Sequence, residues 1–387
     1  MQFDFTVKKG YVNMCMMKKF IGIVVTAAVL TFASGCSSNS DNIVSGIPSG
    51  TDSAGQNDVN GENISSENAA DEIILDQSQE LAGVNPLTGE SGYNVYAAGK
   101  RPVAVMVNNL KAALPQYGID QADIIYELPV EGGITRLMAV YADYTSVPDI
   151  CSVRSCRYYY PIICLGMDAI YCHWGSDKTI ALDTLNRTGI DHLDGEYEGG
   201  LFYRDADRAA SYASEHTGYL CGAELAGKIA EKGFRTDIAP DYAGAYFNFA
   251  PEGENASPAE CAANSVTVNF SDEYFSTFNY DVSTGQYMKL HSGTPHVDGR
   301  SGVQLGFENV FVLQTNVYSY DGYLMSVDLN GGTGYYISNG GAQAITWSKP
   351  SENAPITMYA LDGTELLVNV GESYIGIIGS DKYISIS

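Results

Sequence analysis

Charged residues interrupt apolar segments in one stretch of this 387-residue chain, DIIYELPVEGGITRLMAVYADYTSVPDICSVRSCR (residues 123–157). The charged residues of interest are Glu131, Arg136, Arg154 and Arg157. An unpaired charge is costly to bury, so charges in such segments are usually paired or used. If a helix begins after Ser155 and this serine caps it, free backbone N–H groups and the two flanking arginines would bind a carboxylate or a phosphate.

Later segments are predicted to bring further polar groups to the same place. The apolar run AIYCHW predicts a strand that ends near His173, and the helix after it is predicted to be capped by Ser176. His216 comes from a later element. The alternative is a purely structural network, in which Glu131 pairs with one arginine and Asp123 with another.

An enzymatic alternative uses the same residues. Glu131, His173 and His216 could supply a base and an acid, and Cys172 a nucleophile. Cys172 and His173 are neighbours on a predicted strand, however, so their side chains point to opposite faces. The sequence has no G-x-S-x-G or H-E-x-x-H motif. We therefore expect a non-catalytic protein without a cofactor, and an envelope glycan- or peptide-processing enzyme using Glu131 and His173 is the alternative.

The segment HSGTPHVD is a weaker candidate for a metal site. His291, His296 and Asp298 are residues of the types that bind zinc or manganese. The two histidines do not have the i, i+4 spacing of a helical metal site, and no third histidine is near them in the sequence. A loop that satisfies its own backbone is the preferred interpretation, and we expect no metal.

The first 35 residues have the organisation of a secretory signal peptide, which reads naturally from Met16 or Met17. Two lysines precede a short apolar run, and the following ASGC resembles the bacterial lipobox, whose cysteine is acylated. The run is too short for a membrane span, which needs roughly 20 apolar residues. We expect a lipid anchor on Cys36, a disordered acidic linker over residues 36–84, and an extracytoplasmic location at the bacterial cell membrane.

The charge balance limits the possible partners. The formal net charge is -25, which argues against nucleic acid or anionic lipid headgroups as the main partner. Six cysteines follow the predicted anchor, without the C-x-x-C spacing of zinc sites, so we expect thiols or at most one disulfide.

Apolar and turn patterns predict an α+β protein with two folded parts. The first part, over residues 85–245, is a mixed α/β domain whose sheets are layered against helices. Its helices are predicted over residues 176–187, 204–215 and 223–232, and Gly132-Gly133 are predicted to make the turn before a strand over residues 134–144. The second, over residues 246–387, is a β-rich domain of strands separated by Gly, Asn and Asp turns. Residues 309–315 form one of its predicted strands, and residues 365–370 form the last. Its tyrosines and Trp347 could stack on the sugars of a wall glycan, although tyrosine is also a good strand residue.

Several segments resemble the YerB-like lipoproteins, a family whose domain has no known function. They are RPVAVMVNN, ADIIYELPVEGGITRLMAVYAD, VRSCR, His173-x-Gly175-Ser176, TPHVDG, WSK and LDGTELLVNVGESYI. The resemblance spans most of residues 85–386 and implies an extracytoplasmic lipoprotein with an α/β part followed by a β-rich part. We expect a binding or regulatory protein whose partner is a cell-wall polymer or another envelope protein.

Overall fold

The structure, a computed structural model, describes residues 83–251 and 253–387. The predicted signal peptide, the predicted lipidation of Cys36 and nearly all of the predicted linker lie outside the described residues. Within the described ranges, no helix is long and apolar enough to cross a membrane.

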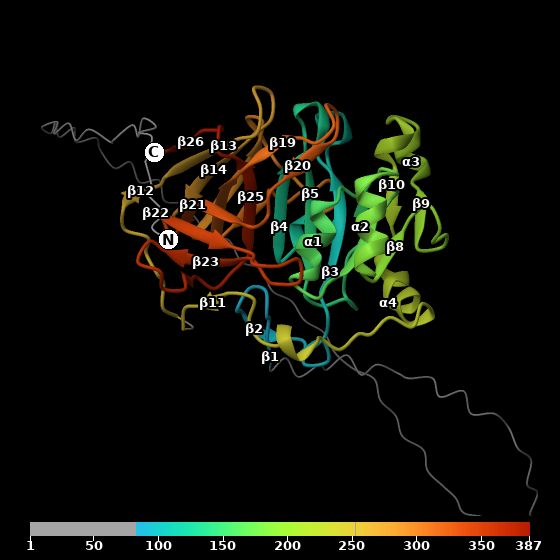
Figure 1. Cartoon of the computed structure of the whole chain (residues 1–387), viewed down its shortest axis with the longest axis horizontal. Helices are drawn as coiled ribbons and strands as arrows, with labels where there is room; N and C mark the ends of the chain where they lie inside the picture. Colours follow the sequence, from blue (N-terminus) through green and yellow to red (C-terminus); the bar gives the residue numbers. More distant parts are fainter. Residues whose placement is uncertain (1–82, 252) are drawn as a thin grey trace, which may run out of the picture. The chain divides into compact units, whose positions relative to one another are not determined.

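Eleven strands form the largest sheet of the described residues, and they come from both predicted parts of the chain (Figure 1). Ten strands follow one another in space: β12 (Cys261–Ala262), β22 (Gly341–Ser348), β21 (Gly331–Ser338), β18 (Asn309–Thr315), β25 (Ser373–Gly379), β4 (Ile124–Pro129), β5 (Thr135–Tyr141), β3 (Val103–Asn108), β7 (Ile170–His173) and β8 (His192–Asp194). The eleventh strand, β23 (Thr357–Ala360), pairs with β22.

β25 joins the two predicted parts, and it lies outside the strands predicted from the sequence. It pairs in parallel with β18 on one side and with β4 on the other, so Tyr374 is in register with Ile125 and Val310. All seven residues of β25 are buried. Figure 1 shows β25 beside β4, although about 250 residues separate them in the chain.

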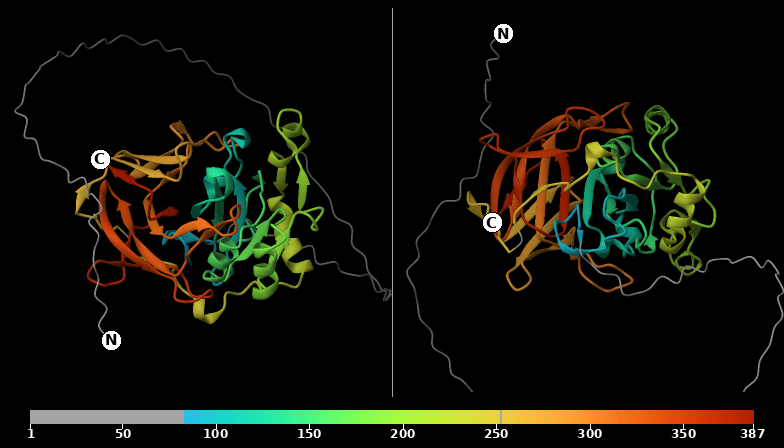
Figure 2. Two further views of the ribbon diagram at one scale, coloured as in Figure 1. Left: turned by 45° about the horizontal axis from the view of Figure 1, so that its top comes forward. Right: turned by 90° about the horizontal axis from the view of Figure 1, so that it is seen from below.

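A six-stranded sheet packs beside this large sheet (Figure 2). It contains β13 (Ser265–Asn269), β14 (Phe275–Asp281), β15 (Gln286–His291), β16 (Thr294–Pro295), β17 (Gly306–Phe307) and β26 (Ile384–Ile386). A three-stranded sheet contains β6 (Ile150–Cys151), β9 (Phe202–Arg204) and β10 (Gly218–Leu220). The two-stranded sheets pair β1 (Gly83–Val84) with β2 (Ser91–Tyr93), β11 (Asn248–Phe249) with β24 (Leu367–Val368), and β19 (Val317–Ser319) with β20 (Met325–Val327).

The α-helices of the described residues are short. They are α1 (Tyr159–Leu165), α2 (Ile180–Thr188), α3 (Ala206–Ala209) and α4 (Gly222–Glu231). α4 agrees with the helix predicted over residues 223–232 to within one residue at each end. α2 ends at Thr188, and Gly189 after it has a left-handed conformation. The helix predicted over residues 204–215 is wrong except for α3. Arg204 is the last residue of β9, and Ser214–His216 form a 3₁₀ turn.

Both faces of the large sheet are buried. In β3, the odd-numbered valines enter one core cluster with residues of α4 and the six-stranded sheet. Ala104 and Met106 enter the other cluster with Tyr159 and Tyr160 of α1. Since alternate residues of a strand point to opposite faces, a strand covered on both sides must be apolar throughout, as RPVAVMVN is. Helices and sheets are thus both in contact with the large sheet.

Candidate functional site

Glu131 and Arg157 form a two-point ion pair at the start of α1. Arg157 Nε donates to both carboxylate oxygens, at 2.9 and 2.8 Å, and Nη2 donates to Oε2 at 2.7 Å. Glu131 lies in the 3₁₀ turn between β4 and β5, and its Oε1 also accepts the backbone N–H of Met325 in β20. The predicted turn at EGG therefore places the carboxylate of Glu131 against the guanidinium of Arg157.

Arg136 is a buried guanidinium that meets no carboxylate in the described part of the chain. It lies in β5 with 6% of its surface exposed, and its Nη1 donates to the carbonyl of Ser155 at 2.6 Å. Within residues 83–251 and 253–387, no Asp or Glu forms an ion pair with it. Its nearest electrostatic neighbours include Arg157 and Arg154, so like charges face one another here.

Arg154 is only loosely paired. Its Nη1 lies 3.7 Å from a carboxylate oxygen of Glu215, whose side chain is 55% exposed. The Nε of Arg154 is buried and has no hydrogen-bond acceptor among the described residues. The hydroxyl of Ser155, beside it in the chain, likewise forms no hydrogen bond in the described part of the molecule.

The pKa values follow from this uneven pairing. Burial lowers the pKa of Arg136 to about 10, and repulsion from Arg157 and Arg154 adds to the effect. Burial also lowers the pKa of Arg154, with Glu215 opposing the shift. Burial alone would raise the pKa of Glu131, but Arg157 holds it below its usual value. We call Arg136, Arg154, Ser155 and Arg157 the arginine cluster; its guanidinium groups outnumber the carboxylates that meet them.

Both predicted serine caps are wrong. α1 begins at Tyr159, four residues after Ser155, because Tyr159 and Tyr160 insert into the core and donate to carbonyls of β4 and β5. α2 begins at Ile180 rather than after Ser176. Asp177 accepts the N–H groups of Thr179 and Ala181 instead, so an aspartate satisfies the first turn.

The predicted histidines do not share one surface. His173 ends β7 as expected, but it is fully buried, and its Nε2 lies 2.9 Å from Nδ1 of His192. Burial lowers its pKa to about 4. His216 does come close to the arginine cluster, since its Nε2 lies 3.5 Å from a carboxylate oxygen of Glu215, the residue that also meets Arg154.

The geometry gives little support to the enzymatic alternative. Glu131 is bound at both oxygens by Arg157, so it has no free position as a base in this conformation. Cys172 is fully buried, and burial raises its pKa well above the range in which a thiolate would form. Among the described residues, Cys151, Cys156, Cys164, Cys172 and Cys221 form no disulfide.

The predicted metal candidates belong to a buried network that contains a cation. Lys289 Nζ lies 3.2 Å from Nδ1 of His296, and Nε2 of His296 meets Gln116. His291 meets a backbone carbonyl, and Asp298 accepts backbone N–H groups of its own loop. Among the described residues, no group of three His, Cys, Asp or Glu side chains could hold a metal ion. A metal cation at His296 would be repelled by the Lys289 ammonium beside it.

Glu127 is the anion of this network, and it was not among the residues predicted for a site. Its Oε2 lies 3.2 Å from Lys289 Nζ, and both side chains are almost fully buried. Thr135, Asn109, Ser276 and Tyr374 donate to its two oxygens. Two features of the sequence point to this buried pair. Glu127 is the one charged residue in IIYELP, and Lys289 occupies an inward position of the alternating strand QYMKLH.

Comparisons with known proteins agree with the resemblance found in the sequence. The profiles of the N-terminal and C-terminal domains of "Protein of unknown function (DUF3048)" match residues 87–235 and 266–375. A curated relative, "Putative lipoprotein YerB" of Bacillus subtilis (strain 168), is 28% identical over 74% of this chain and 84% of that protein. The crystal structure of the YerB protein from Bacillus subtilis matches with a TM-score of 0.68 and 25% identity, over 78% of this chain and 99% of that one.

The two family profiles lie on either side of the predicted boundary at residues 245 and 246, whereas the eleven-stranded sheet contains strands from both sides. The division into two folded domains therefore stays a prediction. The profiles together cover more than half of the sequence, and the relative and its crystal structure match most of it. The chain belongs to the YerB-like family of DUF3048 proteins.

Proposed function

We propose that this protein is a lipid-anchored, extracytoplasmic binding protein whose arginine cluster holds an anionic group of a cell-wall polymer or of another envelope protein. The observation that carries the proposal is Arg136, a guanidinium that is 6% exposed and has no carboxylate partner among the described residues. A buried charge without a counter-ion is costly, and an anionic ligand would remove that cost.

The neighbouring groups favour a carboxylate or a phosphate as this anion. Among the described residues, the Nε–H of Arg154 has no acceptor and the hydroxyl of Ser155 forms no hydrogen bond, so donors are present beside the charge. Arginine binds planar or tetrahedral oxyanions through several N–H groups at once. The chain carries a net charge of -25, so a local excess of arginine is a specific feature rather than part of a basic surface.

The location of this function rests on the N-terminal sequence and on the relative. The lipobox-like ASGC ends at Cys36, and the matching protein of Bacillus subtilis is named as a lipoprotein. Acylation of Cys36 would tether the described domain to the outer face of the cell membrane, where wall polymers and envelope proteins are available. Membrane release of a Cys36→Ser variant is the expected result, and unchanged membrane retention would contradict the anchor.

Binding can be tested by titrating the purified protein with a glycerol phosphate polymer and with muramyl dipeptide, which supply phosphate and carboxylate groups respectively. Arg154→Ala is the informative variant, because Arg157→Ala would leave Glu131 unpaired and disturb the fold. Loss of a charge-assisted hydrogen bond costs about 1.5–3 kcal/mol, so Kd should rise about 10- to 100-fold.

Arg235→Ala is the matched control. It removes the same charge from an arginine that is 47% exposed and that pairs with Asp168 elsewhere on the molecule. It should leave the affinity within about twofold, because exposed pairs contribute little and distant charges are screened. An equal loss in both variants, or no loss in Arg154→Ala, would contradict the assignment to the arginine cluster.

A further inference from the structure

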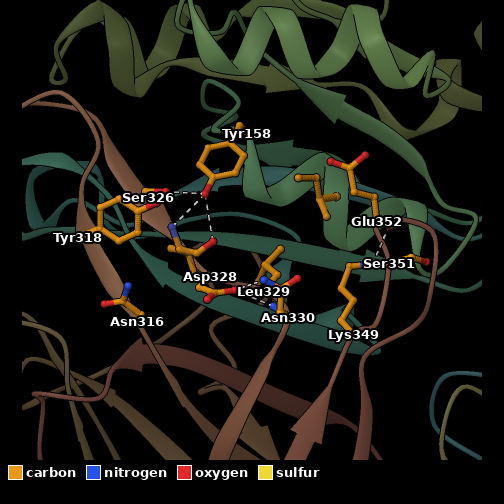
Figure 3. Close-up of a pocket in the computed structure, with 12 residues that line it drawn as sticks. Tyr158, Asn316, Tyr318, Ser326, Asp328, Leu329, Asn330, Lys349, Ser351 and Glu352 are labelled. Atoms are coloured by element: carbon orange, nitrogen blue, oxygen red, sulfur yellow. Dashed lines mark hydrogen bonds between the residues drawn. The ribbon is translucent and has the colours of Figure 1, made fainter. Parts of the chain in front are cut away.

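A cavity of about 490 Å³ opens beside the first turn of α1. Its walls come from α1, from the β19–β20 hairpin, from the loop before β21 and from the segment after β22. Figure 3 shows Tyr158 and Tyr318 at one end of the cavity and Lys349 at the other, with Asp328 and Asn330 between them. The volume is within the range of about 300–1,000 Å³ that is usual for small-ligand sites.

The two tyrosines give this cavity an aromatic end. The hydroxyl of Tyr158 lies 2.7 Å from Ser326 Oγ and donates to the carbonyl of Val327 at 3.1 Å, so its ring is held in place. Tyr318 is 47% exposed and pairs across the hairpin with Ser326. Aromatic rings combine a flat apolar face with a polar tip, which suits a ring-shaped ligand that has apolar C–H faces and polar edges.

The remaining walls are rich in hydrogen-bonding groups. The side-chain amide of Asn316 has no hydrogen-bond partner among the described residues, and it offers both a donor and an acceptor. Lys349 Nζ donates to the carbonyls of Glu352 and Ala354, at 2.7 and 2.5 Å, which leaves one of its three N–H groups for a ligand. Burial lowers the pKa of Lys349 to about 8.

The charges of the cavity argue against an anionic occupant. Asp328 and Glu352 are both in its wall, and Lys349 is the cation that faces them. Arg187 binds the carboxylate of Glu352 from outside the cavity, at 2.7 Å. A phosphate or carboxylate in this space would face Asp328 at close range, whereas hydroxyl and amide groups can bond to every one of these side chains.

We infer that this cavity binds a neutral saccharide unit, with a sugar ring against Tyr158 and Tyr318 and its hydroxyl or amide groups on Asn316, Asp328 and Lys349. The assignment does not depend on the arginine cluster. The two sites are nevertheless contiguous, since Tyr158 follows Arg157 and the N–H of Met325, next to Ser326, donates to Glu131. If the proposed function also holds, the combined ligand is a glycan that carries anionic groups.

The test is calorimetric titration of the full chain with the neutral trisaccharides chitotriose and cellotriose. We expect at least one of them to bind. Tyr318→Ala and Asn316→Ala should each weaken that binding by about tenfold, as for a contact at the centre of a binding site. Tyr320→Ala and Tyr323→Ala are matched controls, because these tyrosines are 59% and 71% exposed on the same hairpin and do not line the cavity.

Arg154→Ala should leave the trisaccharide affinity unchanged, which separates this inference from the proposed function. Absence of binding by both trisaccharides at millimolar concentration would overturn the saccharide assignment. An equal loss in Tyr320→Ala and Tyr318→Ala would also overturn it, because the hairpin surface rather than the cavity would then be the binding site.

Discussion

Glu127 in β4 and Lys289 in β15 lie 3.2 Å apart, with 2% and 0% of their side chains exposed, and they join the large sheet to the six-stranded sheet. Burial would raise the pKa of Glu127, but Lys289 and the surrounding donors hold it below its usual value. Burial lowers the pKa of Lys289, and the Glu127 carboxylate opposes that shift, so each charge favours the other inside the core.

Removing one partner of this pair should destabilise the protein strongly. Lys289→Met leaves the Glu127 carboxylate uncompensated, and the free energy of unfolding should fall by about 3–5 kcal/mol. The double variant Glu127→Gln/Lys289→Met should recover most of the loss, because no unpaired charge remains. Urea unfolding measures the free energy of unfolding of the single and the double variant. Lys382→Met, at an exposed pair with Asp381, is the control, and its free energy of unfolding should differ from the wild type by less than about 1 kcal/mol. A single variant as stable as its control would contradict a charged buried pair.

The Glu131–Arg157 pair predicts a pH-dependent stability difference. Because the pKa of Glu131 is lowered in the folded state, its contribution is present above the unfolded value of 4.5 and is lost as the pH falls through the folded value. Glu131→Gln should therefore cost about 1–3 kcal/mol at pH 7 and progressively less below pH 4.5. Thermal unfolding of the wild type and of Glu131→Gln from pH 7 to below pH 4.5 measures this stability difference. A stability difference that does not change with pH would count against the ion pair.

Glu372 predicts a pH effect of the opposite sign. Burial raises its pKa from 4.5 to about 8, and the nearby carboxylates of Glu308 and Glu90 add to the shift. The folded state then binds the proton more tightly than the unfolded state, so stability declines as the pH rises from about 4.5 to about 8. Glu372→Gln should raise the melting temperature at pH 8 and much less at pH 5. Glu365→Gln is the control at an exposed glutamate and should not reproduce this pattern. A melting temperature of Glu372→Gln below that of the wild type at pH 8 would contradict the raised pKa of Glu372.

Two glycines of α4 provide a matched test of packing. A Cβ on Gly222 would collide with the backbone carbonyl of Val147, whereas a Cβ on Gly227 would meet nothing within 4 Å. Gly222→Ala should destabilise the protein by about 1–3 kcal/mol, as overpacking does. Gly227→Ala should stabilise it by about 0.5–1 kcal/mol, because alanine is the better helix former. Similar effects of the two substitutions in chemical unfolding would show that the helix does not pack as described.

Much of the fold could be predicted from local patterns, but not the connection between its two parts. The bounds of β18 agree with the predicted strand at Asn309–Thr315, and the turn at Glu131 formed as expected. β25 was missed because its two glycines weaken the strand pattern of SYIGIIG. Its parallel partner β4 is also too distant in sequence to leave a local signal.

The candidate site was predictable as a set of charges but not as a geometry. The pairing of Glu131 with Arg157 was one of two expected arrangements. The serine caps failed because the tertiary packing of Tyr159 and Tyr160, rather than local capping, sets the start of α1. The cavity at Tyr158 was not predictable, since it forms where segments more than 150 residues apart meet.

The arginine cluster can be tested residue by residue by NMR of the Nε–Hε groups of ¹⁵N-labelled arginine while inorganic phosphate is added. The Arg154 signal is assigned by comparison with the Arg154→Lys variant. The Nε–H of Arg154 has no acceptor among the described residues, so its signal should move as phosphate binds, and the signal of Arg136 should move with it. The signal of Arg101 should stay, because its Nε already donates to the carbonyl of Asp168 at 2.7 Å. An Arg154 signal that stays in place at a phosphate concentration that shifts the exposed Arg235 would contradict an anion site at the cluster.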